Sequence, residues 1–130
     1  MTSWVRTTKE NDFAANASTG EGRITVSLSG TADVTSRNQL DHFLREVHQE
    51  AQRRRTEEVT VDLRQLEFMN SSCLKCLVWW VSTVQEQPSD AKYRIVFVSS
   101  PSVYWQRRSL EALACLAGDI ISVQTSYWKP

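Results

Sequence analysis

Apolar and polar residues alternate in several short segments of the chain, and longer segments with helical spacing separate them. Strict alternation occurs at residues 24–29 and 59–63, and it predicts two strands with one buried face each. Residues 95–98 form a continuous apolar run, which is typical of a strand covered on both faces. Weaker patterns at residues 12–17 and 120–123 predict a short edge strand and a last strand.

Three segments with apolar residues at helical spacing lie between these strands. The first follows an N-cap at Thr35 or Ser36 and runs through residue 51. The second covers about residues 71–87, and the third begins at a cap formed by Ser100 and continues to residue 117. Because the strands alternate with helices, the sequence predicts an α/β domain whose sheet is largely parallel.

The chain has 130 residues, which fits one domain over residues 1–130. We expect the core to span about residues 12–124, with terminal extensions at residues 1–11 and 125–130. The 15 acidic and 15 basic side chains balance, and a neutral chain is a poor candidate for nucleic-acid binding, which usually needs a basic face, so we expect no nucleic-acid partner. The one basic cluster, Arg53–Arg55, falls at a predicted helix end, where cations stabilise the terminal carbonyls.

The sequence shows no sign of membrane insertion or export. It contains no apolar run long enough for a membrane-spanning helix, and its first residues lack the apolar stretch of a signal peptide. We therefore expect a cytoplasmic protein whose thiols are reduced.

The most informative segment lies where the strand at residues 59–63 hands over to the second helix. The turn reads Phe-Met-Asn-Ser-Ser over residues 68–72, and Asn70 is the predicted helix cap. Ser71 and Ser72 then fall in the first helical turn, where backbone amides have no helical partner and negative charge is favourable. This corner is a candidate site for a phosphate group or for a protein partner.

The same segment contains Cys73 and Cys76 in a C-x-x-C spacing, which also occurs in thiol redox proteins. With Asn70 as the cap, Cys73 lies in the third helical position, too far into the helix for the usual redox geometry. Two thiols packed as small apolar groups are the simpler interpretation. His42 and His48 lie six residues apart on different helical faces, so we predict no metal site and no cofactor.

Trp79 stands out in the second helix. A face directed at the sheet is predicted for Leu74, Leu77, Val78, Val81 and Val84. Trp79 then projects nearly opposite this face, and Trp80 and Cys73 lie on its flank. A tryptophan exposed in this way is typical of an interface anchor, and partial cover by neighbouring long side chains is the alternative.

Taken together, these motifs resemble a STAS domain, the fold of bacterial anti-sigma factor antagonists. The most specific segment is Asp62-Leu63 followed by Phe-Met-Asn-Ser-Ser, and Leu28-Ser29-Gly30 followed by Asp33 resembles the first strand–helix corner of the family. The resemblance covers about residues 12–124. It implies an α/β fold with a mixed, mostly parallel sheet of about four to five strands and about three helices packed mainly on one face.

The resemblance also implies a non-enzymatic function. In the partner-switching members of the family, a partner kinase phosphorylates the first serine of an Asp-Ser-Ser-Gly corner, and the matching residue here is Ser71, with Ser72 as the alternative. Asn70 replaces the usual Asp, and Cys73 replaces the usual Gly. The expected partner is a protein: a serine kinase that acts as an anti-sigma factor, or a subunit of a signalling complex. The expected contact residues are Asp33, Met69, Asn70, Ser71, Ser72, Cys73, Lys75 and Trp79.

Two other functions stay open at the sequence level. One is a constitutive scaffold or accessory subunit, of a signalling assembly or a transporter, without a phosphorylation switch. The other is a thiol redox protein that uses the C-x-x-C pair.

Overall fold

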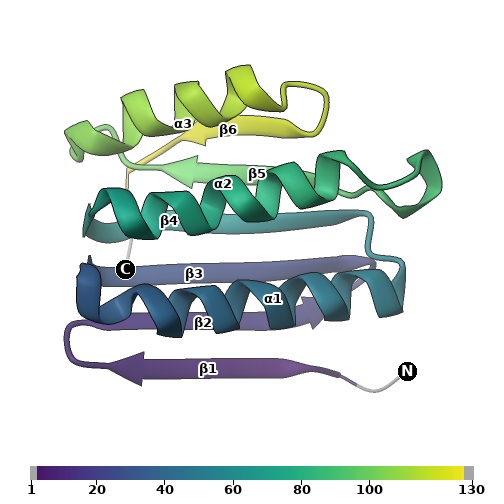
Figure 1. Ribbon diagram of the computed structural model, residues 1–130, viewed down its shortest axis with the longest axis horizontal. Coiled ribbons are helices and arrows are strands. Elements are labelled where there is room, and N and C mark those ends of the chain that lie inside the picture. The colour runs from purple at the N-terminus through teal and green to yellow at the C-terminus, as the bar shows by residue number, and fades with distance from the viewer. Residues whose placement is uncertain (1–2, 128–130) are drawn as a thin grey trace.

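The computed structural model describes residues 3–127, which form one six-stranded sheet with three helices. The strands lie side by side in chain order (Figure 1). They are β1 (Val5–Glu10), β2 (Phe13–Gly20), β3 (Arg23–Ala32), β4 (Glu58–Met69), β5 (Arg94–Ser99) and β6 (Ile121–Thr125). The pairs β1–β2 and β2–β3 are antiparallel, and β3 to β6 pair in parallel.

Each parallel pair is joined by one helix, and all three helices cover the same face of the sheet (Figure 1). They are α1 (Arg37–Arg54), α2 (Ser71–Gln85) and α3 (Tyr104–Leu116). Crossovers of one hand that always step to the next strand in the same direction place their helices on one face. The predicted mixed, mostly parallel sheet with helices on one face is therefore confirmed. None of the helices described is long and apolar enough to cross a membrane.

The sheet has more strands than the four to five predicted from sequence. The additional strand is β1, which lies inside the predicted N-terminal extension and forms one edge of the sheet. Residues 12–17 were predicted as the edge strand, and they instead form part of β2, which is paired on both sides. β1 buries none of its side chains, so its sequence carries no apolar alternation. Residues 1–2 and 128–130 of the predicted extensions lie outside the described part of the chain.

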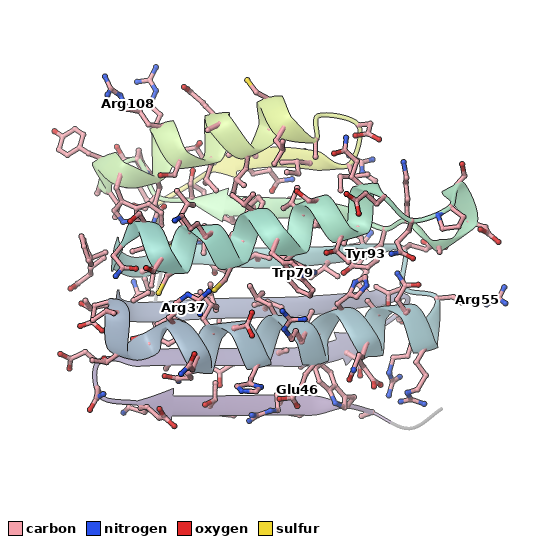
Figure 2. The ribbon with its side chains drawn as sticks, in the orientation of Figure 1. Arg37, Glu46, Arg55, Trp79, Tyr93 and Arg108 are labelled. Atoms are coloured by element: carbon pink, nitrogen blue, oxygen red, sulfur yellow. The ribbon has the colours of Figure 1, made fainter. Side chains whose placement is uncertain are left out.

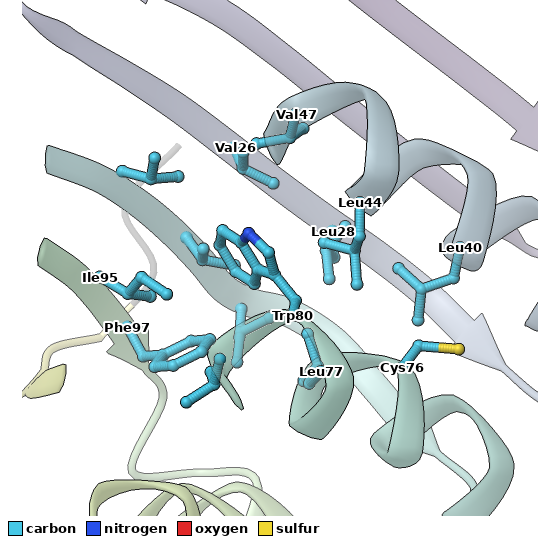
Figure 3. Close-up of a cluster of buried hydrophobic side chains, with 14 of the residues drawn as sticks. Val26, Leu28, Leu40, Leu44, Val47, Cys76, Leu77, Trp80, Ile95 and Phe97 are labelled. Carbon is cyan, nitrogen blue, oxygen red and sulfur yellow. The ribbon is translucent and has the colours of Figure 1, made fainter. Parts of the chain in front are cut away.

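The core lies between the sheet and the helices, and Trp80 is its largest fully buried side chain. Figure 3 shows Trp80 between α1 and the sheet, with aliphatic side chains of β3, α1 and β5 around it. Its neighbours in that view include Val26, Leu44 and Phe97. Burying an aromatic side chain of this size makes it one of the largest single contributions to the stability of a domain.

One local prediction about a helix end was wrong. Ser100 does not cap α3, which begins at Tyr104 after a turn at residues 101–102. β3 extends beyond the predicted residues 24–29 and continues through Gly30 to Ala32. Gly30 has a φ of +87°, and a Cβ there would lie 1.7 Å from the carbonyl oxygen of Asp12. The position therefore requires glycine because the backbone of the turn that leads into β2 passes too close for any side chain.

Candidate partner-binding corner

The corner between β4 and α2 is built around Asn70. Its side-chain oxygen accepts a hydrogen bond from the amide of Cys73 at 2.9 Å, so Asn70 caps α2 as predicted. Its carbonyl oxygen accepts from the amide of Leu74 at 3.0 Å. In the described part of the chain, the amides of Ser71 and Ser72 make no hydrogen bond. The first turn of α2 therefore has two free donors beside two hydroxyl side chains.

A second corner, between β3 and α1, lies against the first. The amide of Asn70 donates to the carbonyl of Ala32 at 2.9 Å, and the thiol of Cys73 donates to the carbonyl of Asp33 at 3.2 Å. The Asp33 carboxylate in turn accepts from the hydroxyl and the amide of Thr35. These hydrogen bonds lower the pKa of Asp33, and the one from the Thr35 hydroxyl has the largest effect. The two corners therefore form one continuous surface that includes a carboxylate.

The residues predicted to contact a partner differ in their exposure. Ser71 and Lys75 are exposed, and they share the outward face of α2 with Val78. Ser72 is half-buried, and Met69 is buried with 8% of its surface exposed. Apolar surface also lies at this end of the sheet, because Phe68 is 48% exposed and Val34 is 70% exposed. The corner therefore presents an exposed hydroxyl together with apolar side chains.

Cys73 was predicted to contact a partner, but its side chain is fully buried. Burial, followed by the nearby Cys76 and Asp33, raises the pKa of the Cys73 thiol to about 11. Burial also raises the pKa of Cys76. A redox-active C-x-x-C pair needs an accessible thiol with a lowered pKa. Both thiols have the opposite character, and they pack as small apolar groups.

The predicted direction of Trp79 was wrong. Trp79 points toward α1 and is only partly exposed (Figure 2). The guanidinium carbon of Arg45 lies 4.1 Å from its ring centroid, and the ring of His48 meets it edge-on. Trp80 is fully buried instead, whereas Val78, predicted to face the sheet, is 37% exposed. Trp79 therefore stabilises the contact between the two helices more than it offers an anchor to a partner.

The face of α2 directed at the core differs from the predicted one because the helix packs against both the sheet and α1. The buried side chains of α2 are Cys73, Cys76, Leu77, Trp80, Val81 and Val84. The prediction placed only Leu and Val on this face. The two thiols and the indole of Trp80 are also apolar enough to be buried. With these three residues included, the buried face of α2 is directed partly at α1.

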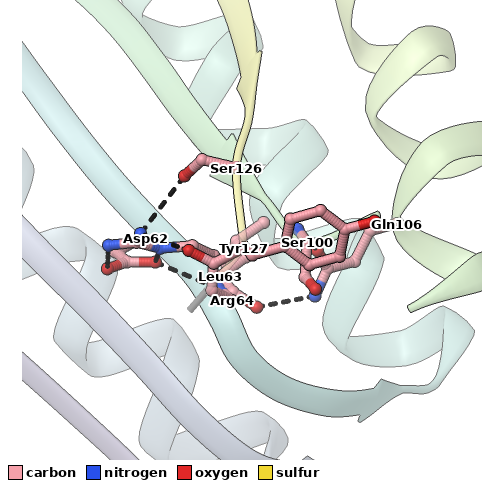
Figure 4. A network of polar contacts seen from close by, with 7 residues as sticks. All are labelled: Asp62, Leu63, Arg64, Ser100, Gln106, Ser126 and Tyr127. Atoms are coloured by element: carbon pink, nitrogen blue, oxygen red, sulfur yellow. Dashed lines mark hydrogen bonds and ion pairs between the residues drawn. The ribbon is translucent and has the colours of Figure 1, made fainter. Parts of the chain in front are cut away.

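Sequence reasoning missed Gln106, which is fully buried in α3 and holds the end of β4 in place (Figure 4). Its amide nitrogen donates to the carbonyls of Leu63 at 2.6 Å and Leu66 at 3.0 Å, and its oxygen accepts from the amide of Ser100. The pairing of β4 with β5 ends at Asp62, so Gln106 replaces the missing strand neighbour. It thereby fixes the segment that leads into the Ser71 corner.

Among residues 3–127, no group of three or more His, Cys, Asp or Glu side chains is arranged to hold a metal ion.

Arg37 lies at the first turn of α1, at the same end of the molecule as the corner (Figure 2). Its backbone carbonyl is the nearest acceptor on α1 for the thiol of Cys76, at 3.9 Å. The corner thus has basic side chains on both helices, Arg37 and Lys75.

The comparisons with known proteins concern the fold. No family model matches the sequence, and no curated protein matches it either. The solved structures that match include an anti-sigma factor antagonist from Mycobacterium paratuberculosis, with a TM-score of 0.62 and 16% sequence identity. The match covers 93% of this chain and 86% of the other. The chain therefore has the STAS-like fold that its motifs resemble.

Proposed function

We propose that this chain is a non-enzymatic protein-interaction domain of the anti-sigma factor antagonist type, acting in the bacterial cytoplasm. The corner formed by Asn70, Ser71 and Ser72 docks on a protein partner, a serine kinase that acts as an anti-sigma factor. Phosphorylation of Ser71 by that partner ends the interaction. The chain then acts by switching between two charge states, without chemistry of its own.

One observation carries the proposal: the hydroxyl of Ser71 is exposed in the first turn of a helix, beside two backbone amides that have no hydrogen-bond partner among residues 3–127. A phosphate on Ser71 adds a charge of about −1.5 to −2 at a position where the helix favours an anion. The same charge beside the exposed Phe68 and Val34 opposes docking of an apolar or acidic partner surface. Ser72 is half-buried and therefore the less accessible acceptor.

Phosphorylation by a partner can be tested by intact mass. The full chain is incubated with candidate anti-sigma factor kinases of its host and ATP, and the mass is recorded with time. One added phosphate is expected on the natural chain and on Ser72→Ala, and none on Ser71→Ala. A phosphate that persists on Ser71→Ala and disappears from Ser72→Ala would move the switch to Ser72.

The second candidate function is a constitutive scaffold subunit, and Cys73 favours it. Its side chain fills the space between the two corners and donates to the Asp33 carbonyl, which fixes them relative to each other. Asn70 also favours the scaffold, because a kinase that recognises the usual Asp of the partner-switching members would meet an amide there instead of a carboxylate. Absence of phosphate on every serine, together with stable co-purification of a partner, would support the scaffold.

A further inference from the structure

The two edge strands of the sheet differ in how they are protected from pairing with another chain. β1 carries three charged side chains, Arg6, Lys9 and Glu10, and charges on an edge strand oppose such pairing. β6 reads Ile-Ser-Val-Gln-Thr, with no charged residue and no proline. β6 therefore lacks the side chains that usually keep an edge strand unpaired.

The hydrogen bonds at the end of β6 show which of its backbone groups point away from the sheet. The amide of Ser126 donates to the carbonyl of Ser99 in the neighbouring strand, at 2.9 Å. Backbone groups of successive strand residues point to opposite edges, so those of Ile121, Val123 and Thr125 face outward. The amide of Ile121 donates to Ala117. Within the described residues, the amides and carbonyls of Val123 and Thr125 have no partner.

A groove of about 600 Å³ lies between this open edge and α3. One face of α3 lines it, with Tyr104, Arg107, Glu111 and Ala114 at helical spacing, and Val123 lines it from β6. In Figure 1, α3 lies over β6 and extends past the edge of the sheet. A seventh strand could therefore pair with the open edge of β6 and lie in this groove, beneath α3.

We propose that an extended segment of a partner protein pairs with β6 and fills this groove. The free amides and carbonyls of Val123 and Thr125 are complementary to the backbone of a strand. The charged groups of the lining, Arg107 and Glu111, pair with each other at 3.4 Å. The lining therefore offers no net charge to a partner. For this reason the side chains of the partner segment that enter the groove are small and uncharged, either apolar or β-branched. The segment is distinct from the partner proposed at Ser71, because it binds the outer edge of β6.

A second copy of this chain does not fit the groove as well as an isolated strand does. If β6 of a second copy paired antiparallel with β6, its own α3 would lie on the same face of the joined sheet. The α3 of the first copy already extends over that space (Figure 1). The occupant is therefore a strand without a helix above it.

The proposal can be tested with a short synthetic peptide of alternating threonine and valine, with lysines at both ends for solubility. Binding to the full chain is followed by the amide NMR spectrum. The amide signals of Val123 and Thr125 are expected to shift and to exchange more slowly with solvent, while those of β1 stay unchanged. The same peptide with N-methylated backbone amides serves as the control, because it keeps the side chains and loses the hydrogen bonds.

Two variants sharpen the test. Val123→Pro removes an outward amide that β5 does not use, so the fold is kept and peptide affinity falls by about tenfold or more. Val123→Lys places a charge in the groove and keeps the backbone, and it decides the outcome if the proline variant unfolds. The proposal is overturned if Val123 and Thr125 do not respond, if the N-methylated peptide binds equally well, or if the lysine variant keeps full affinity.

Discussion

The two ends of α2 are held in different ways. At its N-terminus the helix is fixed by backbone hydrogen bonds and by the amide side chain of Asn70, and the Ser71 hydroxyl remains exposed. In its second half, Trp80 is fully buried and its ring nitrogen donates to the hydroxyl of Tyr93 at 2.8 Å. That hydroxyl also lies 2.8 Å from the Nδ1 atom of His48, on α1.

This difference suggests how one helix can carry a switch without losing its place in the fold. The Trp80 end connects α2 to α1 and to the segment before β5, so it fixes the position of the helix. At the other end the side chain of Ser71 is exposed, so the proposed phosphate would change the surface charge and leave the core as it is. The buried anchor of α2 and the exposed Ser71 hydroxyl therefore lie in different parts of the helix.

The largest expected effect is at the buried end. Trp80→Ala removes the largest buried side chain of the core and should lower the free energy of unfolding by about 3–5 kcal/mol. Val78→Ala, on the exposed face of the same helix, should change it by less than about 0.5 kcal/mol. Urea unfolding of both variants measures the difference, and equal losses would contradict the assignment of the two faces.

A smaller loss is expected for Tyr93→Phe. The substitution leaves the ring nitrogen of Trp80 and the Nδ1 atom of His48 without their common partner, which should cost about 1–3 kcal/mol. Tyr104→Phe is a matched control because the side chain of Tyr104 is exposed. If both tyrosine variants unfold at the same urea concentration, the Tyr93 hydroxyl does not hold the two helices together.

Asn70→Ala should destabilise the chain by about 1 kcal/mol, because the amide of Cys73 loses the oxygen that caps the helix. Asn70→Asp keeps an oxygen in the same place and adds a negative charge at the helix N-terminus, so it should be at least as stable as the natural chain. Thermal unfolding compares them. A stable Asn70→Ala variant would mean that the cap contributes little.

A further expected effect is a dependence of stability on pH. The hydroxyl oxygen of Tyr93 accepts from the ring nitrogen of Trp80 and lies 2.8 Å from the Nδ1 atom of His48, and a neutral His48 can accept the hydroxyl proton there. Burial lowers the pKa of His48 below its ordinary 6.5. The unfolded chain then binds more protons than the folded one, so stability should fall as the pH drops below 6.5. His48→Asn should reduce this slope, and His42→Asn, at an exposed position, should leave it unchanged.

The features that sequence predicted well are those whose partners are close in the chain. Asn70 and the amide of Cys73 lie three residues apart, so a local pattern was enough to identify the cap. Gln106 could not be found in this way, because its partners Leu63 and Leu66 are about forty residues away. Its type also gave no signal, since glutamine usually lies on the surface of a helix.

The errors at Trp79 and β1 have a similar cause. The direction of Trp79 depends on how α2 is rotated against both the sheet and α1, and only the assembled fold determines that rotation. β1 is held by backbone pairing with β2 and by contacts with α1, such as the ion pair between Arg6 and Glu46. A strand that buries no side chain leaves no apolar period in the sequence.

The affinity of the natural chain for a candidate anti-sigma factor kinase, compared with that of two variants at residue 71, tests the proposed switch most directly. Calorimetry would compare the natural chain, Ser71→Ala and Ser71→Asp, after equal unfolding curves have shown that all three fold alike. The natural chain and Ser71→Ala should bind alike, and Ser71→Asp and the chain phosphorylated at Ser71 should bind at least about tenfold more weakly. Equal affinity of all four forms would contradict a switch at Ser71.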